Sequence, residues 1–425
     1  MATDYTQMWK DLGLDIGKHC RLMDVLMEVY PQLYMTQKDR PAAMGYFDFV
    51  VSEAHGLRIQ ELLAHKAQGG KVVGSFCVYV PEEVILAVGA IGVGLCAGTD
   101  FASDAASAVL PASVCPLIKA AVGFKLGRVC PYFESSDLVV GETTCDGKKK
   151  AWEILGKYQE MHVMELPHTK RDGARTLWRS EVQAFAHKME ELSGRTLTAE
   201  SLRKGIQLVD AKRQALQRLA RLRQANPAVI SGKDALLVEQ VAFYDDVTRF
   251  TAKVNELCDE LDGRVASGTG VFPATTPRLL ISGSPMALPN WKLHHVIETS
   301  GGVVVGEESC VGARYYTDRV TSQSDTVEGM LDAIASRYLC VNCACFTPNT
   351  DRIDQILDMV RDTKARGVVH YSLTFCQPYI VESQLVKEAL DKAGVPLLLI
   401  ETDYGMGDTA QLQTRIQAFL EQMPA

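Results

Sequence analysis

Several features that would assign a compartment or a class of partner are missing from this chain. The longest apolar stretch, from Val84 to Gly98, is about fifteen residues long and lies between Glu83 and Asp100. A membrane-spanning helix needs roughly 20 apolar residues, so this stretch predicts a core helix followed by a strand. The chain starts Met-Ala-Thr-Asp-Tyr, without the basic and apolar regions of a secretory leader. We therefore expect a cytoplasmic protein with no membrane partner.

Motifs for nucleic-acid binding, nucleotide binding and hydrolysis are also missing. The net charge of -8 and the isoelectric point of about 5.7 argue against nucleic acid as a partner. Glycine pairs such as Gly301-Gly302 form neither a P-loop nor a complete GxGxxG fingerprint, so we expect that the chain does not bind ATP itself. No GxSxG elbow is present, which leaves a hydrolase triad without support.

The pattern of apolar runs predicts an α/β protein. With 425 residues, of which 47% are hydrophobic and 23% charged, the chain can form two or three globular domains. Two blocks alternate short apolar strands with helical patterns, which favours two Rossmann-like lobes, each a doubly wound parallel sheet, facing one cleft. We divide the chain into an N-terminal helical segment (1–65), a first lobe (66–171), a helical connector (172–276) and a second lobe (277–425).

Each lobe is expected to contain four strands. In the first lobe we predict strands over 71–77, 93–96, 137–143 and 162–166, with helices over 81–90 and 147–158. In the second lobe we predict strands over 279–282, 302–305, 368–375 and 396–400, with helices over 294–299 and 411–421.

Cysteine is abundant, with twelve residues, and most of them follow apolar runs. A single buried thiol says little, because free cysteine is among the most buried residue types. Cys20 and Cys258 lie in helix-like segments without special flanks, and we assign them to the core. Cys77, Cys145 and Cys376 each follow a predicted strand, and the carboxyl ends of parallel strands form the binding crevice of such sheets. Several thiols would therefore converge on one cleft, where thiolates suit soft metals and iron–sulfur clusters.

Three cysteines stand directly before a predicted helix or a proline. These pairs are Cys115-Pro116, Cys145-Asp146 and Cys376-Gln377. A helix N-terminus lowers the pKa of a thiol and favours the thiolate. Nearby N–H groups can also point at cluster sulfides. From the residues alone, cluster ligands and ordinary core thiols remain equal alternatives.

The remaining cysteines offer further candidates. Cys340-x-x-Cys343-x-Cys345 is the tightest cluster and could hold zinc or one edge of an iron–sulfur cluster. Zinc would need a second ligand pair, but no later CxxC or HxxxH follows. Cys130-Pro131 repeats the Cys-Pro pair, while Cys310 and Cys96 each end an apolar run.

Three consecutive lysines, Lys148 to Lys150, follow Cys145. Such a run is usually a solvated helix face. At a helix start, however, it opposes the helix dipole, which hints at contact with a phosphate or an acidic partner.

Several of these segments together carry a family resemblance. They are residues 76–83 (FCVYVPEE), 115–119 (CPLIK), 141–150 (GETTCDGKKK) and 400–404 (IETDY), with the stretch around Cys376. From about residue 60 to the end, the chain resembles the 2-hydroxyacyl-CoA dehydratase and benzoyl-CoA reductase superfamily, and the Cys145 segment is the most specific part of the likeness. The excess of cysteines in matching flanks resembles, within this superfamily, the double-cubane cluster proteins.

The resemblance implies a ligand set. Dehydratase subunits of this superfamily hold one [4Fe–4S] cluster on three cysteines, and the matching positions here are Cys115, Cys145 and Cys376. A double cubane, in which two [4Fe–4S] units share a bridging sulfide, takes six cysteines. The other three would come from Cys77, Cys96, Cys130, Cys310, Cys343 and Cys345. By position we favour Cys77, Cys130 and Cys345.

The resemblance also implies a reaction and a partner. A separate ATP-hydrolysing iron–sulfur activator protein would supply electrons at very low potential, and this chain, as a homodimer, would reduce a small unsaturated or N–N bonded molecule. The alternatives are a [4Fe–4S] 2-hydroxyacyl-CoA dehydratase subunit with a heteromeric partner and a CoA pocket, and a non-enzymatic electron-transfer protein. No catalytic residue is assigned. Candidates for proton delivery, each more simply explained as a polar loop residue, are Glu82, Glu307, Glu308, His370 and Tyr371.

Overall fold

Two four-stranded parallel sheets organise the protein. The structure, a computed structural model, describes residues 3–423. The first sheet has the order β2-β1-β3-β4, and the second has the same order shifted along the chain, β6-β5-β7-β8. The strands are β1 (Val72–Ser75), β2 (Ile91–Gly94), β3 (Leu138–Glu142), β4 (Met161–Met164), β5 (Arg278–Gly283), β6 (Val303–Glu308), β7 (Gly367–Leu373) and β8 (Leu397–Thr402).

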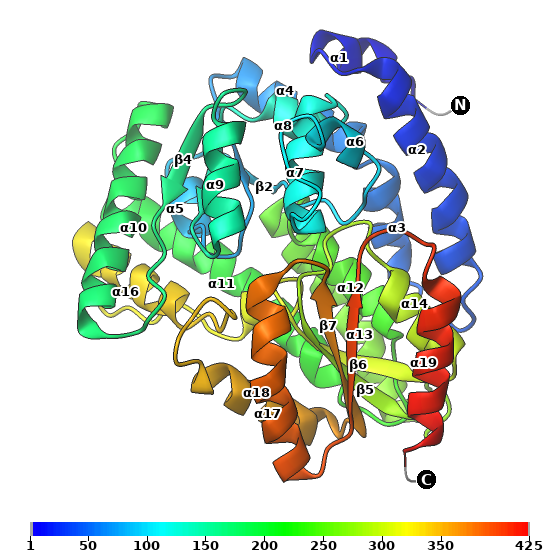
Figure 1. The fold of residues 1–425 in the computed structure, drawn as a ribbon. Coiled ribbons are helices and arrows are strands. Elements are labelled where there is room, and N and C mark those ends of the chain that lie inside the picture. Colours follow the sequence, from blue (N-terminus) through cyan, green and yellow to red (C-terminus); the bar gives the residue numbers. More distant parts are fainter. Residues whose placement is uncertain (1–2, 424–425) are drawn as a thin grey trace.

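Helices cover both sheets, and the first sheet lies above the second in the view of Figure 1. The helices of the first lobe are α5 (Glu82–Ala87), α6 (Ser103–Ala106), α7 (Pro116–Leu126), α8 (Pro131–Ser135) and α9 (Asp146–Leu155). Those of the second are α14 (Lys292–Thr299), α15 (Ala313–Tyr316), α16 (Val327–Leu339), α17 (Thr350–Thr363), α18 (Gln377–Ala393) and α19 (Thr409–Glu421). Strands β3, β5, β6 and β7 are buried along their whole length, as expected for parallel strands covered on both faces. The expectation of two Rossmann-like lobes is confirmed.

Helices also form the two segments outside the lobes. The N-terminal segment contains α1 (Thr6–Asp11), α2 (Ile16–Tyr30), the π-helical turn η1 (Pro31–Met35), α3 (Met44–Ser52) and α4 (Leu57–Ala67). The segment between the lobes contains α10 (Asp172–Ser193), α11 (Ala199–Leu222), α12 (Gly232–Val241) and α13 (Val247–Ser267). Within residues 3–423, no helix combines the length and the apolar composition that a membrane crossing needs.

Side-chain caps define the starts of the connecting helices. Thr198 and Ser201 form a capping box at α11, and Asp246 accepts hydrogen bonds from two amides at the start of α13. Ser231 caps α12, all of whose residues are buried. Helix α12 therefore belongs to the interior rather than to a solvated connector.

Close contacts fix the two lobes against each other. The Gly98 amide, in the loop after β2, donates to the Leu288 carbonyl at 2.9 Å, and a Cβ at position 98 would lie 2.0 Å from the Ala287 oxygen. Only glycine allows this approach between the loops of the two lobes. The Tyr79 hydroxyl of the first lobe donates to the Val341 carbonyl of the second at 2.8 Å.

The strand boundaries differ from expectation mainly at β6. The sequence predicts a strand over 302–305, whereas β6 continues to Glu308. The two glutamates at its end looked like a polar loop, but each is neutralised by buried arginines, so the chain stays extended through them. Glu307 and Glu308 are thus part of the buried sheet.

Candidate functional site

Thiols gather at the carboxyl ends of the strands. Cysteines follow five strands: Cys77 after β1, Cys96 after β2, Cys145 after β3, Cys310 after β6 and Cys376 after β7. All twelve cysteines are free thiols. The two sheets therefore present thiols toward one region, where the sequence analysis placed the cleft.

Three thiols form one group, which we call the cap group: Cys115, Cys145 and Cys376. They are the N-cap residues of α7, α9 and α18, respectively. The Cys115 and Cys376 thiols lie within hydrogen-bonding reach of each other, and Cys145 lies close enough to interact electrostatically with both. The resemblance named these three positions together, and the structure brings them together.

Backbone amides surround the cap group. The Lys148 amide donates to the Cys145 sulfur at 3.4 Å, and the amides of Leu117 and Ile118 point at Cys115. The hydrogen bond from Cys376 lowers the pKa of Cys115, and the same bond raises the pKa of Cys376. Three helix N-termini aimed at one place give a positive potential that favours bound negative charge.

The residue before Cys376 adopts an uncommon conformation. Phe375 has a φ of 64°, in the left-handed region, although its side chain is 43% exposed and fills no core position. A bulky residue is strained there, and such strain is found mainly where surrounding structure requires it. It sets the turn that places Cys376 at the start of α18.

Four other thiols form a second group, which we call the loop group: Cys77, Cys310, Cys343 and Cys345. None of them caps a helix, since they lie in the loops after β1, β6 and α16. The Cys77 and Cys310 thiols interact with each other, as do those of Cys343 and Cys345, and Cys310 interacts electrostatically with Cys343.

A buried arginine lies beside the loop group, where the Cys345 amide also contacts the Cys343 thiol. The Arg314 side chain is fully buried, and its Nη1 lies 3.4 Å from the Cys310 sulfur. The Tyr379 hydroxyl lies 3.6 Å from the Cys343 sulfur and also contacts Arg314. The hydrogen bond from Cys345, together with the Arg314 charge, lowers the pKa of Cys343 to about 6.

A network of charges holds Arg314 in place. Its Nε donates to Glu308 at 2.6 Å, and Arg352 donates to the same carboxylate at 2.8 Å. Although burial acts to raise it, these two arginines hold the pKa of Glu308 at about 2. Arg352 is also paired with Glu382. The carboxylate therefore stays ionised and fixes the guanidinium group beside the thiols.

Lys148 stands between the two groups. Its ammonium forms an ion pair with Glu142, whose Oε1 also accepts from Thr144 at 2.7 Å. Burial acts to lower the pKa of Lys148, but the nearby Glu142 and Cys77 raise it. The positive charge of Lys148 in turn acts to lower the pKa of the Cys145 and Cys310 thiols.

The prediction that Lys148 belongs to a surface contact is therefore wrong. Lys148 is 9% exposed, because the helical period of α9 turns it inward, while Lys149 and Lys150 point to solvent. Those two pair with Asp146 and Glu153. Contact with a phosphate or an acidic partner stays a prediction for Lys149 and Lys150 only.

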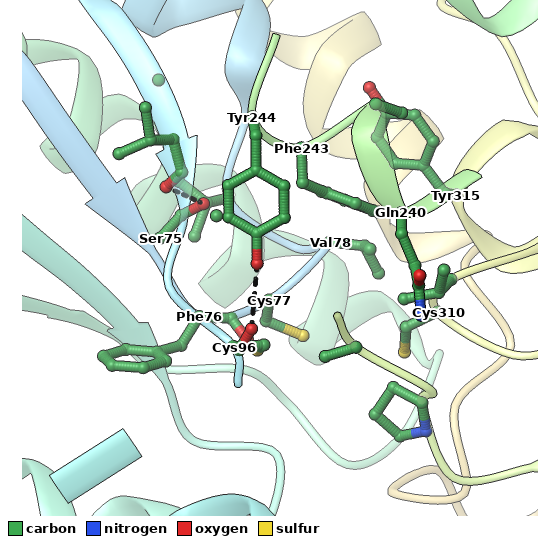
Figure 2. A pocket seen from close by; sticks show the side chains of 18 of the residues that line it. Ser75, Phe76, Cys77, Val78, Cys96, Gln240, Phe243, Tyr244, Cys310 and Tyr315 are labelled. Atoms are coloured by element: carbon green, nitrogen blue, oxygen red, sulfur yellow. Dashed lines mark hydrogen bonds between the residues drawn. The ribbon is translucent and has the colours of Figure 1, made fainter. Parts of the chain in front are cut away.

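A pocket opens beside the loop group, and we call it the thiol pocket. It is lined by the cysteines Cys77, Cys96 and Cys310 and leaves about 100 Å³ open to water-sized molecules (Figure 2). Lys212 and Glu82 form the charged side of this pocket, with 2.6 Å between the Lys212 Nζ and the Glu82 carboxylate. The Tyr315 hydroxyl donates a hydrogen bond to the Glu82 carboxylate at 2.8 Å.

Of the candidates for proton delivery, Glu82 lines the thiol pocket and the other four are not among its lining residues. Glu307 is buried between Arg223 and His294, and Glu308 belongs to the arginine network. Burial lowers the pKa of His370 to about 4, so its imidazole is neutral at pH 7. Tyr371 accepts a hydrogen bond from Asn290 at 3.0 Å.

Cys130 does not join either group. It caps the short helix α8, where it receives the amides of Tyr132 and Phe133, and its charged neighbours are Glu134 and Lys125. Burial raises its pKa to about 11. Its assignment as a ligand stays a prediction, and the geometry favours Cys310, which the sequence analysis also considered.

The three cysteines of the Cys340-x-x-Cys343-x-Cys345 motif do not stay together in the structure. Cys343 and Cys345 turn into the loop group, while the exposed Cys340 donates to the Ser336 carbonyl at 3.4 Å. Cys96 is kept protonated, because it donates to the Phe76 carbonyl at 2.9 Å and burial raises its pKa to about 12. Cys258 is buried in α13, consistent with its assignment to the core.

Sequence reasoning did not find the charged residues that face the thiols. Arg314, Tyr379 and Glu142 are the clearest cases. The signal was present in GETTCDGK, where a glutamate precedes the cysteine by three residues and a lysine follows by three. Nothing in the sequence showed that Arg314 or Tyr379 would point inward.

The thiols suit a cluster better than a single ion. Among residues 3–423, no three His, Cys, Asp or Glu side chains surround a point where one metal ion would fit. Iron–sulfur clusters are held by cysteine thiolates, and hydrogen bonds to their sulfur atoms tune the reduction potential. Two groups of three and four thiols, each facing donors of positive potential, match that chemistry.

Comparison with known proteins gives one consistent picture. The family model for the 2-hydroxyglutaryl-CoA dehydratase D-component matches residues 77–423. The chain is 38% identical to "Putative dehydratase subunit YjiM" of Escherichia coli, over 91% of this chain and 99% of that protein. It is 25% identical to the (R)-phenyllactyl-CoA dehydratase beta subunit of Clostridium sporogenes, over 85% and 94% of the two chains. It is 21% identical to one of the subunits of benzoyl-CoA reductase from Thauera aromatica, over 83% and 90%.

Proposed function

Because the chain belongs to the 2-hydroxyglutaryl-CoA dehydratase D-component family, we propose that it is an iron–sulfur reductase. It receives low-potential electrons from a separate ATP-hydrolysing activator protein and transfers them to a small molecule. The observation that supports this best is the presence of two thiol groups on either side of the buried Lys148, where a single-cluster subunit would need only one.

Each thiol group would hold one half of a double cubane. The cap group supplies Cys115, Cys145 and Cys376, and the loop group supplies Cys77, Cys310 and Cys345, with Cys343 as a fourth thiol beside them. A bound cluster of this kind supplies a store of electrons at low potential.

The protein's own charges would hold these electrons. Lys148 lies between the two groups and Arg314 lies beside the second, so each added electron is stabilised by a nearby cation. Burial strengthens both effects, because the surroundings screen the charges less than water does.

Protons would enter on the open side of the thiol pocket. Glu82 is partly exposed and binds Lys212 and Tyr315. These residues can hold a proton at the Glu82 carboxylate or the Lys212 ammonium and pass it toward a molecule beside Cys77. The reduction of hydrazine, the simplest N–N bonded molecule, consumes two electrons and two protons, breaks the N–N bond and forms two N–H bonds. Two protons per turnover must therefore reach the pocket.

We further propose that the protein works as a homodimer, as the resemblance implies, and in the cytoplasm, as the sequence leads us to expect. Lys149 and Lys150 are candidates for contact with the activator, since both point to solvent. Charge reversal at both positions should slow activator-driven reduction, and an unchanged rate would remove this contact from the account.

A second candidate is a 2-hydroxyacyl-CoA dehydratase subunit, which the names of several relatives favour. It requires room for a CoA thioester. The thiol pocket is small, and a larger cleft of about 600 Å³ near Cys340 is lined by several aspartates, including Asp351, Asp354 and Asp358. Lys170, Arg175 and Arg223 line the same cleft, so these carboxylates share it with cations that could bind the phosphates of CoA.

Turnover with the activator separates these functions. The reduced activator, ATP and the purified chain would be supplied with hydrazine in one reaction and with (R)-2-hydroxyglutaryl-CoA in another. The proposal predicts ammonia from hydrazine and no unsaturated thioester. Dehydration of the thioester would support the second candidate. A chain that becomes reduced but converts neither compound would be an electron-transfer protein, and the proposal would fail.

A further inference from the structure

A second pocket adjoins the thiol pocket, and we call it the apolar pocket. It lies between α2, the end of α3 and the loop after β2, and leaves about 70 Å³ open to water-sized molecules. Four residues line both pockets: Gly94, Cys96, Tyr244 and Leu288. The two pockets are therefore neighbours with one shared wall.

The walls of the apolar pocket carry no formal charge. Among the residues that the structure describes, its lining contains no Asp, Glu, Lys or Arg, in contrast to the thiol pocket with Glu82, Lys148 and Lys212. Leu26 and Val51 are typical of the lining. An ion that entered would lose its hydration without gaining a partner, so charged molecules are excluded.

The two phenols of the lining are already hydrogen-bonded. The Tyr132 hydroxyl donates to the Ala54 carbonyl at 2.7 Å, and the Tyr244 hydroxyl donates to the Cys96 carbonyl at 3.1 Å. The buried Nδ1 of His55 is a polar atom without a hydrogen-bond partner. Burial lowers the pKa of His55 to about 3, so this imidazole is neutral and does not attract anions. The pocket thus offers mainly apolar surface, with Cys96, Cys130, Thr99 and the neutral His55 ring as its weakly polar residues.

Tyr244 occupies the shared wall. Figure 2 shows its ring beside the cysteines of the thiol pocket and its hydroxyl bonded to the Cys96 backbone. Phe243, its chain neighbour, also lines the thiol pocket. The end of the Tyr244 side chain is held by this one hydrogen bond, and its ring packs on Tyr132 with the ring centroids 5.3 Å apart, so Tyr244 forms part of the boundary between the two pockets.

We propose that the apolar pocket binds small, uncharged, apolar molecules and opens past Tyr244 into the thiol pocket. This rests on the proposed function and extends it, because the apolar pocket would hold apolar unsaturated substrates beside the thiol pocket in which hydrazine is reduced. Substrate molecules would bind first in the apolar pocket. They would then pass Tyr244 and receive electrons and protons in the thiol pocket.

Xenon tests this site without any need for turnover. Apolar cavities of this kind stay dry and bind xenon, whereas a polar cavity fills with ordered water. Crystals of the full chain with its cofactor would be pressurised with xenon. We expect a xenon peak between Leu26, Val51 and Tyr132. Ordered water in that place, with no xenon, would overturn the proposal.

Matched variants test whether xenon binds in the apolar pocket and whether Tyr244 separates that pocket from the thiol pocket. Ala54→Phe adds a ring next to the pocket and should abolish the xenon peak, while Ala108→Phe makes the same change at an exposed position and should leave it. Tyr244→Ala should add a second xenon peak beside Cys77, and Tyr244→Leu serves if that chain does not fold. A xenon peak that survives Ala54→Phe, or a thiol pocket that stays empty in both Tyr244 variants, would contradict the proposal.

Failure of this inference can be told apart from failure of the proposed function. If hydrazine is reduced but xenon does not bind, the function stands and the apolar site falls. If xenon binds but no small molecule is reduced, the site stands and the function falls.

Discussion

The cap group and the loop group stabilise their thiols by different means. At the cap group, positive potential comes from the backbone, through the N-termini of α7, α9 and α18. At the loop group it comes from side chains, chiefly Arg314 and the hydroxyl of Tyr379. Backbone amides do not titrate, and only substitution by proline removes one. The cap group is therefore a fixed environment, whereas the loop group can be tuned by mutation and by pH.

The comparison also suggests different tasks for the two groups. A guanidinium next to a bound cluster would stabilise its reduced form through one formal charge, whereas the helix ends would do so through partial charges of the backbone. In the proposed function, the loop group, of which Cys77 and Cys310 line the thiol pocket, would be the site that finally holds the electrons.

The largest expected effect comes from removing a ligand. Cys145→Ser in the cap group and Cys310→Ser in the loop group should each lower iron content by about four atoms per chain, because in the proposed function each group holds one [4Fe–4S] unit. Cys130→Ser is the matched control and should keep all iron. The opposite result, with iron lost in Cys130→Ser and kept in Cys310→Ser, would show that the choice made from sequence is right and the geometric choice wrong.

The buried ion pair between the groups should be the next most sensitive place. Lys148→Met leaves the Glu142 carboxylate buried without its partner, which costs about 3–5 kcal/mol of unfolding free energy. Adding Glu142→Leu removes the unpaired charge and should recover most of the loss, as measured by urea unfolding. Lys149→Met, whose partner Asp146 is exposed, should change stability little. Equal losses in the two single variants would place Lys148 at the surface after all.

Acid should destabilise the protein at His370, which lies close to the arginines beside the loop group. His370 lies on β7 near Arg352, and burial lowers its pKa to about 4. Between pH 6.5 and 4 the unfolded chain binds a proton at this histidine and the folded chain does not, so the free energy of unfolding falls as pH is lowered, by up to about 3 kcal/mol. In His370→Gln this part of the decline should disappear from unfolding curves measured at a series of pH values. The exposed His187→Gln is the control, and an unchanged slope in His370→Gln would refute the assignment.

The smallest expected effect is a shift in reduction potential. Arg314→Gln removes the cation at 3.4 Å from Cys310, so a reduced cluster at the loop group loses stabilisation. Its potential should fall by about 60 mV, equivalent to about 1.4 kcal/mol for one electron, while the cap-group potential stays the same. Titration followed by EPR measures both. Arg361→Gln changes an exposed arginine and serves as the control. Equal potential shifts at both clusters in Arg314→Gln would contradict the claim that Arg314 acts on the loop group alone.

Much of the fold could be predicted from sequence, because parallel strands buried on both faces leave continuous apolar runs. The runs around Val139 and Val369 gave β3 and β7 almost to the residue. The end of β6 was missed for a long-range reason. Glu307 and Glu308 look like loop residues until Arg223 and Arg314 are known to face them.

The candidate site was accessible from sequence only in part. Cys115, Cys145 and Cys376 carry a local signal, since each precedes a helix start. Cys130 carries the same signal and caps α8 without meeting another thiol, so a local rule cannot separate it from the others. Cys310 joins Cys77 across the two lobes, a contact that only the tertiary structure reveals.

The amount of iron and acid-labile sulfide per chain, with EPR after reduction of anaerobically purified protein, tests the central claim most directly. Two thiol groups that each hold a [4Fe–4S] unit predict about eight irons per chain and a coupled signal. About four irons, or none after careful reconstitution, would contradict the claim.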